Sequence, residues 1–247
     1  MLINEEAFCR IGDTTYFSSY DGFSNLKDGD TLYLLKDFDG SDIHSIPAGG
    51  HYTIASAPEL GQKVTIAPDY GLAFSDNQGE VTLKNVKIDC NGDSVRVGKG
   101  VTLILGEGTE IANGSPAITA GYSNAGTVVM KPGASITGSE LGVKVRSGLM
   151  FRMEGGSITG NYNDADFASG ITLENGTLAI SGDAQVTGNT IGAFDANGSS
   201  IPGTFNGNIY VAPGAKVDLT QLGSGAKIGL AFDPYRPDGQ PTADAPI

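Results

Sequence analysis

The segment 160–170 (GNYNDADFASG) concentrates side chains that carry hard oxygen donors. Carboxylate and amide oxygens are the ligands that Ca²⁺ prefers, so Asn163, Asp164 and Asp166 form a candidate calcium site. The segment lacks the twelve-residue spacing of an EF-hand loop, and the chain has no GGxGxD nonapeptide repeat. An acidic, solvated corner without a bound ion is the simpler interpretation, and no other cofactor is indicated.

A second candidate site is the long polar segment 190–207 (TIGAFDANGSSIPGTFNG). Aromatic rings can stack on sugar faces, and function concentrates on long loops. We therefore predict glycan binding by four residues of this segment, Phe194, Asp195, Asn197 and Phe205. A corner excursion without a ligand is the simpler alternative.

The residues give no recognisable catalytic constellation. Glycoside hydrolysis needs two carboxylic acids at a fixed separation, and the chain contains neither an Asp-Asp dipeptide nor a His-Gly word. Lys144, Arg146 and Arg152 are candidate bases for a polysaccharide lyase, although solvated side chains on an outward strand face explain them more simply. Whether the chain is an enzyme stays open at this point, and the residues favour a non-enzymatic protein.

Composition narrows the possible partners. The chain has 247 residues, a formal charge of −13, 37 glycines and no tryptophan. Binding to nucleic acid requires clustered Lys and Arg, which this balance disfavours. No run of 18 apolar residues exists, so we predict no membrane insertion, and Met1–Glu6 lacks the features of a signal peptide. Cys9 and Cys90, with 80 residues between them, are expected to be buried thiols, and one disulfide is the alternative.

A short pattern recurs five times: apolar-x-apolar, a turn with Gly or Pro, then Ile or Val. Apolar residues alternate within each copy, as in a strand with one buried face, and no helical segment of ten or more residues intervenes. The copies are 25, 23, 27 and 31 residues apart, and they start at Leu103, Val128, Phe151, Leu178 and Ile209.

Near-identical words at such intervals favour a solenoid over an antiparallel sandwich or barrel, because each coil repeats the environment of its neighbour. We predict an all-β fold, a right-handed parallel β-helix of about eight coils. Asn161 and Asn189 are expected to form an inward asparagine ladder. The inward row is expected to contain Ile111, Ile136, Ile158 and Val186.

Three regions are indicated by this pattern. Residues 1–30 are predicted to form an N-terminal cap, with a short helix in Phe17–Leu26 whose apolar stripe covers the first coil. Residues 31–232 are predicted to form the β-helix. Residues 233–247 contain four prolines, which indicates an extended linker or tail.

Several words resemble a known group of domains: IGDTTY (11–16), KDGDTLYLLKDF (27–38), GSITGN (156–161) and GNIYVAPGAKVDL (207–219). They are similar to pectin-lyase-like β-helix repeat domains of cell-surface proteins from Gram-positive, often gut, bacteria. The resemblance covers roughly residues 10–232. The fold is shared with pectate lyases and polygalacturonases, and a fold does not transfer function.

The resemblance implies a secreted module at the bacterial cell wall or surface. We expect a non-enzymatic, monomeric spacer or adhesin that binds a host or microbial glycan, or a surface protein. A carbohydrate-active enzyme, a lyase or hydrolase on acidic polysaccharide, is the alternative. The charge of −13 disfavours that alternative, because an anionic substrate would be repelled unless Ca²⁺ bridged the two.

Overall fold

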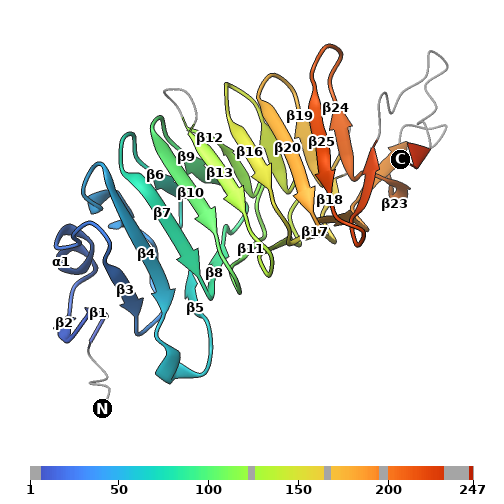
Figure 1. Cartoon of the computed structure of the whole chain (residues 1–247). Helices are drawn as coiled ribbons and strands as arrows, with labels where there is room; N and C mark the ends of the chain where they lie inside the picture. The colour runs from blue at the N-terminus through green and yellow to red at the C-terminus, as the bar shows by residue number, and fades with distance from the viewer. Residues whose placement is uncertain (1–6, 122–125, 164–167, 195–199, 231–244, 247) are drawn as a thin grey trace.

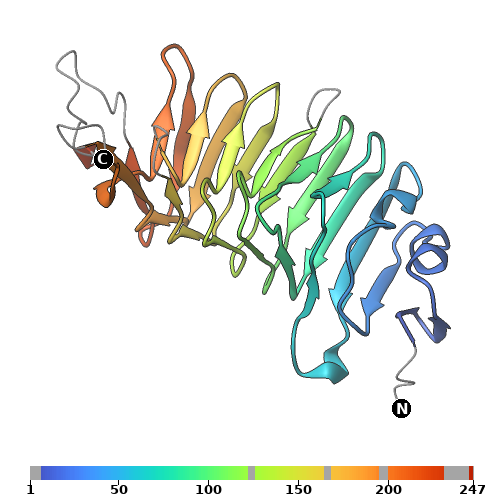
Figure 2. The same cartoon turned by 180° about the vertical axis from the view of Figure 1, so that it is seen from behind.

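The computed structural model describes residues 7–121, 126–163, 168–194, 200–230 and 245–246. They form a right-handed parallel β-helix, which confirms the predicted fold class. Figures 1 and 2 show the coils stacked in one row, with helix α1 (Ser19–Ser24) at one end and the last strands at the other. No helix within the described ranges is long and apolar enough to cross a membrane.

Three sheets run the length of the stack. Sheet A contains β1 (Cys9–Ile11), β2 (Thr14–Tyr16), β3 (Thr31–Leu34), β4 (Gly50–Ser56), β7 (Gly79–Lys84), β10 (Val101–Leu105), β13 (Thr127–Met130), β16 (Met150–Met153), β20 (Thr177–Gly182) and β25 (Val217–Leu222). Sheet B contains β5 (Val64–Ile66), β8 (Val86–Asp89), β11 (Glu110–Ala112), β14 (Ser135–Thr137), β17 (Ser157–Thr159), β21 (Gln185–Thr187), β26 (Lys227–Leu230) and β27 (Ala245–Pro246). Sheet C contains β6 (Leu72–Phe74), β9 (Val95–Val97), β12 (Ile118–Ala120), β15 (Val143–Val145), β19 (Ile171–Leu173) and β24 (Ile209–Val211).

Smaller elements lie between the sheets. Two 3-10 helices occur within the described ranges, η1 (Ile43–Ser45) and η2 (Pro58–Leu60). A small sheet D leaves the stack between sheets B and C, and it contains β18 (Tyr162–Asn163), β22 (Thr190–Phe194) and β23 (Ser200–Asn206).

The described strands make about six turns, fewer than the predicted eight. A count of eight assumes that every turn has the same length, but β3 at one end and β25 with β26 at the other belong to incomplete turns. Tyr52–Ile54 and Val64–Ile66 also look like successive coils in sequence. They lie in β4 and β5, which are two sides of the same turn.

The inward row is confirmed. Ile111 pairs with Ile136, Ile136 with Ile158, and Ile158 with Val186, all in parallel register on sheet B. All four side chains are fully buried. Leu103, Val128, Phe151 and Leu178 form the equivalent row on sheet A.

The prediction for the fifth copy of the repeat was wrong, because it placed Ile209 on the sheet of the other four copies. Ile209 pairs with Ile171 on sheet C, and Val217 takes the place next to Leu178 on sheet A. The hairpin of β22 and β23 lengthens this turn, so spacing alone misplaced the strand. An apolar-x-apolar triplet fits any of the three sheets equally well.

The asparagine ladder is also confirmed, and Asn208 extends it. Nδ2 of Asn161 donates to Oδ1 of Asn189 at 2.8 Å, and Nδ2 of Asn189 donates to Oδ1 of Asn208 at 3.1 Å. The backbone amides of Asn161 and Asn189 donate to the same oxygens. Oδ1 of Asn161 accepts from the amide of Ser139 at 3.0 Å. The ladder therefore satisfies buried donors that a tight corner would otherwise leave unpaired.

The N-terminal end is covered by α1 and by the antiparallel strands β1 and β2. Phe23 and Leu26 are buried, but Phe17 and Tyr20 are more than half exposed. The predicted four-residue stripe is therefore half right, because the helix spans only Ser19–Ser24: Phe17 precedes it, and Tyr20 lies on the face that is turned away from the core. The boundaries at 30 and 232 stay predictions, and most of 233–247 lies outside the described ranges.

Both cysteines are free and buried, which agrees with the first interpretation and not with a disulfide. Burial raises the pKa of the Cys9 thiol and of the Cys90 thiol to about 12. Both therefore act as small apolar side chains in the core.

Replacing Ile136 with alanine should lower the free energy of unfolding by about 2–5 kcal/mol, since it removes a fully buried side chain between two identical neighbours. Urea denaturation followed by circular dichroism measures the loss. Thr137→Ala, on the outward side of the same strand, is the matched control and should change little. Equal losses in the two variants would contradict the inward row.

Asn189→Ala should also destabilise the protein, by about 1–3 kcal/mol for each donor left unpaired. Two donors of Asn161, its backbone amide and Nδ2, lose their shared acceptor. Thr187→Ala, at the outward-facing end of β21 two residues before Asn189, is the control. Thermal unfolding that is unchanged in Asn189→Ala would show that the ladder contributes nothing.

Candidate functional site

The outer face of sheet A carries a ladder of hydroxyl groups at its N-terminal end. Thr31 and Tyr33 of β3 point outward, because Leu32 and Leu34 between and beside them are fully buried. Thr31 is in register with Thr53, and Thr53 with Thr82. Neighbouring strands are about 4.8 Å apart, so the three hydroxyls repeat at that interval along the stack.

A cleft of about 590 Å³ lies over this ladder, and we call it the sheet-A cleft. Its floor is formed by residues of β3, β4 and β7, and its sides by the η2 segment and by the turn after β10. The lining residues with polar side chains are Thr31, Tyr33, Thr53, Ser56, Thr82, Lys84, Asn85 and Glu107, and Pro58 shapes one wall.

The Tyr33 ring is held from one side by Arg10. The guanidinium carbon of Arg10 lies 4.3 Å from the ring centroid. Nε and Nη2 of Arg10 bind the two carboxylate oxygens of Glu59 at 3.1 and 3.2 Å. This hydrogen bonding lowers the pKa of Glu59 and raises the pKa of Arg10, so both stay charged. Because Glu59 lies in η2, the ion pair connects the wall of the cleft to its aromatic floor.

Lys84 and Glu107 give the far end of the cleft one positive and one negative group. Both side chains are exposed, and neither has an ion-pair partner within the described part of the chain. The cleft thus combines an aromatic ring, three outward threonine hydroxyls, the exposed Asn85 amide, an ammonium group and a carboxylate. A mixed set of donors and acceptors beside a ring suits a neutral, polyhydroxylated ligand.

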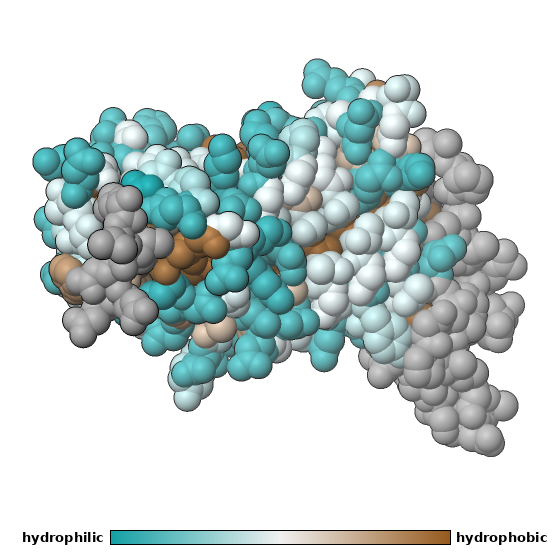
Figure 3. Space-filling view, turned by 90° about the horizontal axis from the view of Figure 1, so that it is seen from below, coloured by the Kyte–Doolittle hydropathy of each residue, from teal (hydrophilic) through white to brown (hydrophobic). Residues whose placement is uncertain are grey.

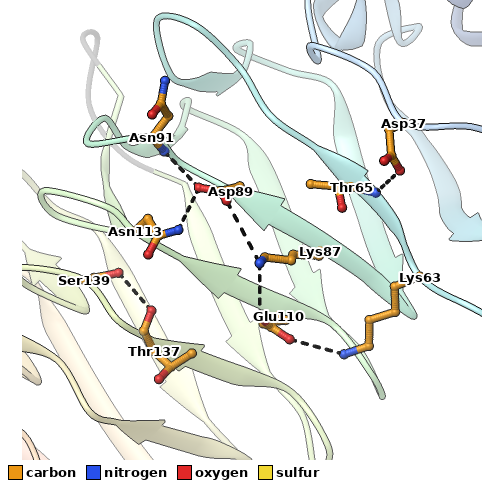
Figure 4. A network of polar contacts seen from close by, with 10 residues as sticks. All are labelled: Asp37, Lys63, Thr65, Lys87, Asp89, Asn91, Glu110, Asn113, Thr137 and Ser139. Atoms are coloured by element: carbon orange, nitrogen blue, oxygen red, sulfur yellow. Dashed lines mark hydrogen bonds and ion pairs between the residues drawn. The ribbon is translucent and has the colours of Figure 1, made fainter.

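Charged side chains on the outer face of sheet B form ion pairs with one another. Figure 4 shows Lys63 and Lys87 both directed at Glu110, with Nζ to carboxylate distances of 3.6 and 3.8 Å. Asp89 lies 4.0 Å from Lys87 and accepts from Nδ2 of Asn113 at 2.9 Å. Such partly exposed pairs add little stability, but they leave few unpaired charges on this face.

The underside of the stack is mainly hydrophilic. Figure 3 shows teal and pale residues over most of this face, and the brown apolar areas are small and separate. A protein partner that docks through apolar contacts needs a contiguous patch of several hundred Å².

The four predicted glycan-binding residues of the long segment 190–207 lie partly in described strands and partly outside the described residues. Phe194 ends β22 and Phe205 lies in β23, whose backbones pair in antiparallel fashion. Asp195 and Asn197 lie in the tip between them, outside the described residues. The segment leaves the stack as a hairpin, and its glycan-binding role stays a prediction.

The predicted calcium site falls largely outside the described ranges as well. Asn163 lies in β18, next to Ile191 of β22. Asp164 and Asp166 follow it in the segment 164–167, which is not described. Within the residues that are described, no group of three or more His, Cys, Asp or Glu side chains is placed to hold a metal.

The three candidate lyase bases do not converge. Lys144 lies on sheet C and binds Glu174 at 3.1 Å. Arg152 lies on sheet A and binds Glu154 at 2.9 Å. Arg146 is in the turn after β15. The outward orientation of Lys144, opposite buried valines, is confirmed. Lys144 is paired with Glu174, and Arg152 shares Glu154 with Lys131.

Hydrogen bonds keep several carboxyl groups ionised. A general acid for glycoside hydrolysis needs a pKa raised toward neutrality. The pKa is instead lowered, by hydrogen bonds from His51, Ser41, Arg10 and Thr220 respectively, for Asp28, Asp39, Glu59 and Asp218.

The cleft residues were missed in the sequence, although a signal was present. TLYLL (31–35) and YTIA (52–55) alternate, and alternation alone places Thr31, Tyr33 and Thr53 outside. The side wall gave no signal, since only the tertiary structure brings η2 and Glu107 to the same cleft. Comparison of the chain with models of protein families, with curated proteins and with solved structures gave no match.

His51, on the outer face of β4, forms an exposed pair with Asp28 at 2.8 Å. Asp28 raises the pKa of His51 above its ordinary value of 6.5, and His51 lowers that of Asp28. The folded protein thus holds the histidine proton more tightly than the unfolded chain does. The resulting stabilisation is fully present below pH 6.5 on the histidine side, and it is lost as pH rises through the raised pKa.

Asp28→Asn should therefore lower the pKa of His51 toward 6.5, which a proton NMR titration of the ring measures. Asp13→Asn, at the exposed turn between β1 and β2, is the charge-matched control and should leave the titration unchanged. An unaltered His51 titration in Asp28→Asn would show that the pair does not form in solution.

Proposed function

We propose that this chain is a non-enzymatic glycan-binding module, and that the sheet-A cleft is its binding site. The observation that carries the proposal is the Tyr33 ring, held by Arg10 and Glu59, beside the ladder of Thr31, Thr53 and Thr82. A sugar ring stacks on the tyrosine, and its hydroxyls bind the threonines and Lys84. A neutral glycan fits best, because the protein carries a charge of −13.

Rigidity supports this role. The floor strands β3, β4 and β7 are bonded to one another in parallel register within sheet A, so the floor of the cleft is ordered before a ligand arrives. Little conformational entropy is then lost on binding. A stiff, elongated stack is also suited to display a binding face at a distance from a surface.

The wider setting is part of the proposal. The resemblance to pectin-lyase-like domains of Gram-positive surface proteins supports an extracellular location at a bacterial cell wall, with host or microbial glycan as the partner. A surface protein as partner is less well supported, because the apolar areas visible on the underside are small.

The rival function is a lyase or hydrolase acting in the same cleft. Lys84 would be the base and Glu107 the only carboxylate among the described lining residues. A lyase acting on acidic polysaccharide also needs a cation to neutralise the substrate carboxylate. The described residues offer no metal cluster near these two side chains.

A glycan array followed by calorimetric titration with the best oligosaccharide tests the proposal. Tyr33→Ala should weaken binding roughly 3- to 10-fold, the contribution of one aromatic stacking contact. Met150→Ala is the matched control, because Met150 is exposed on the same sheet outside the cleft. Equal affinity in the two variants, or no glycan bound at all, would refute the assignment.

A reducing-sugar release assay on the bound glycan and on pectin, with and without EDTA, tests the rival. The proposal expects no product under either condition. Product that disappears in Lys84→Ala but persists in Met150→Ala would establish an enzyme in this cleft.

A further inference from the structure

An alanine interrupts a row of long side chains that crosses the floor of the sheet-A cleft. The row consists of equivalent outward positions on β1, β3, β4 and β7, each in register with the next, and its members are Arg10, Tyr33, Ala55 and Lys84. Ala55 is only 5% exposed although it points outward, and it lines the cleft together with Tyr33 and Lys84. Ala55 therefore lies at the bottom of a gap between two larger side chains, and we call this gap the Ala55 slot.

The Tyr33 ring turns one face toward this slot. Its other face is covered by Arg10, whose guanidinium carbon lies 4.3 Å from the ring centroid. Arg10 belongs to β1 and Ala55 to β4, on opposite sides of β3, so the uncovered face is turned toward Ala55. The two bonds from Arg10 to Glu59 hold the guanidinium in place. The tyrosine ring is therefore a fixed wall of the slot.

The width of the slot matches one sugar ring. Neighbouring strands are about 4.8 Å apart, so the backbones at Tyr33 and Lys84 are separated by about 9.6 Å. Rings that stack face to face lie about 4.5 Å apart or slightly more. A ring stacked on Tyr33 would thus lie above Ala55, and its second face would meet the methylene groups of Lys84, which can pack on apolar surfaces.

The slot is closed at one end, where β4 leads into η2. Pro58, Asn85 and Glu107 line this end of the cleft. The Ser56 hydroxyl donates to the Asn85 carbonyl at 2.5 Å, and the Asn85 amide donates to the Glu107 carbonyl at 2.9 Å, so the end wall is held together. Thr53 borders the opposite end with a short side chain. An internal sugar of a glycan has links on two sides, whereas a terminal sugar has one link and fits a slot with one closed end.

The polar groups around the slot include both donors and acceptors. The Lys84 ammonium donates, the Glu107 carboxylate accepts, and the Asn85 amide and the Thr53 hydroxyl can do both. An ionised ligand would be attracted by one of the two charges and repelled by the other. A neutral ring with several hydroxyls can use all four groups.

We propose that the Ala55 slot receives one terminal sugar of a glycan, a neutral hexopyranose, and that Ala55 determines this specificity. One C–H face of the sugar stacks on Tyr33 and the other packs on the methylene groups of Lys84. The inference rests on the proposed function, and it adds which part of the glycan is recognised: the end of the chain and not its middle.

The dependence of affinity on ligand length tests this inference with the unmodified protein. The probes are the methyl pyranosides of D-glucose, D-galactose and D-mannose and the linear tetrasaccharide of each sugar, titrated into the ¹⁵N-labelled chain by NMR. At least one methyl pyranoside should bind and shift the amides of Ala55 and Lys84. Its tetrasaccharide should have an affinity within about 3-fold, because both ligands place one ring in the slot.

A tetrasaccharide that binds more than about 10-fold tighter would show that internal sugars are recognised, and it would overturn the slot while glycan binding stands. A glycan array with bound oligosaccharides but no binding of any methyl pyranoside would do the same. An array without any bound glycan would refute the proposed function, and this inference with it.

Ala55→Leu should weaken binding of the methyl pyranoside by about 10-fold or more, because the larger side chain takes the space of the sugar. Ala55→Ser keeps a small side chain and should bind within about 3-fold of the unmodified protein. Ala179→Leu is the matched control, since Ala179 is a partly exposed alanine on the outward side of β20, outside the cleft.

Circular dichroism checks that the three variants fold, and the length series decides if Ala55→Leu does not. Unchanged affinity in folded Ala55→Leu, or an equal loss in Ala179→Leu, would overturn the role of Ala55. The comparison of Tyr33→Ala with Met150→Ala would then still measure glycan binding by the cleft as a whole.

Discussion

The structure depends on one constraint, the parallel stacking of each coil in register on the coil before it. Backbone hydrogen bonds fix the spacing between neighbouring strands, and side chains at equivalent positions then meet identical or similar partners. Ile111, Ile136 and Ile158 are buried because they touch one another along the stack. Asn161 and Asn189 stack in the same way at a corner, where the side-chain amide of one hydrogen-bonds that of the other. Because stacked side chains bury one another, a narrow core can exclude water without a large globular interior.

Parallel stacking does not require particular side chains at the outward positions, and the outer faces of sheets A and B carry different groups. Sheet B fills its face with ion pairs around Glu110. Sheet A leaves a ring, a hydroxyl ladder and two charges without ion-pair partners among the described residues at one cleft. The sheet-A cleft lies at the N-terminal coils, where the segment that contains η2 forms one of its walls.

Prediction from the sequence succeeded where a local pattern repeats and failed where a pattern is shared by different sheets. The row from Ile111 to Val186 and the asparagine ladder were predicted from spacing alone. The number of turns and the position of Ile209 were not predicted correctly. A three-residue strand pattern does not indicate which of the three sheets the strand joins. The predicted stripe failed at Phe17, which precedes the six-residue helix, and at Tyr20, which lies on the helix face turned away from the core.

The sequence by itself determined the alternation of buried and outward residues, and with it the β-helix and the outward placement of Thr31 and Tyr33. Only the tertiary structure decided which outward residues share a cleft. Glu59 reaches Arg10 across 49 residues, and Glu107 joins Pro58 in one cleft across a similar distance. Alternation is local and is set by the backbone, whereas convergence depends on how corners of unequal length place their side chains on neighbouring coils.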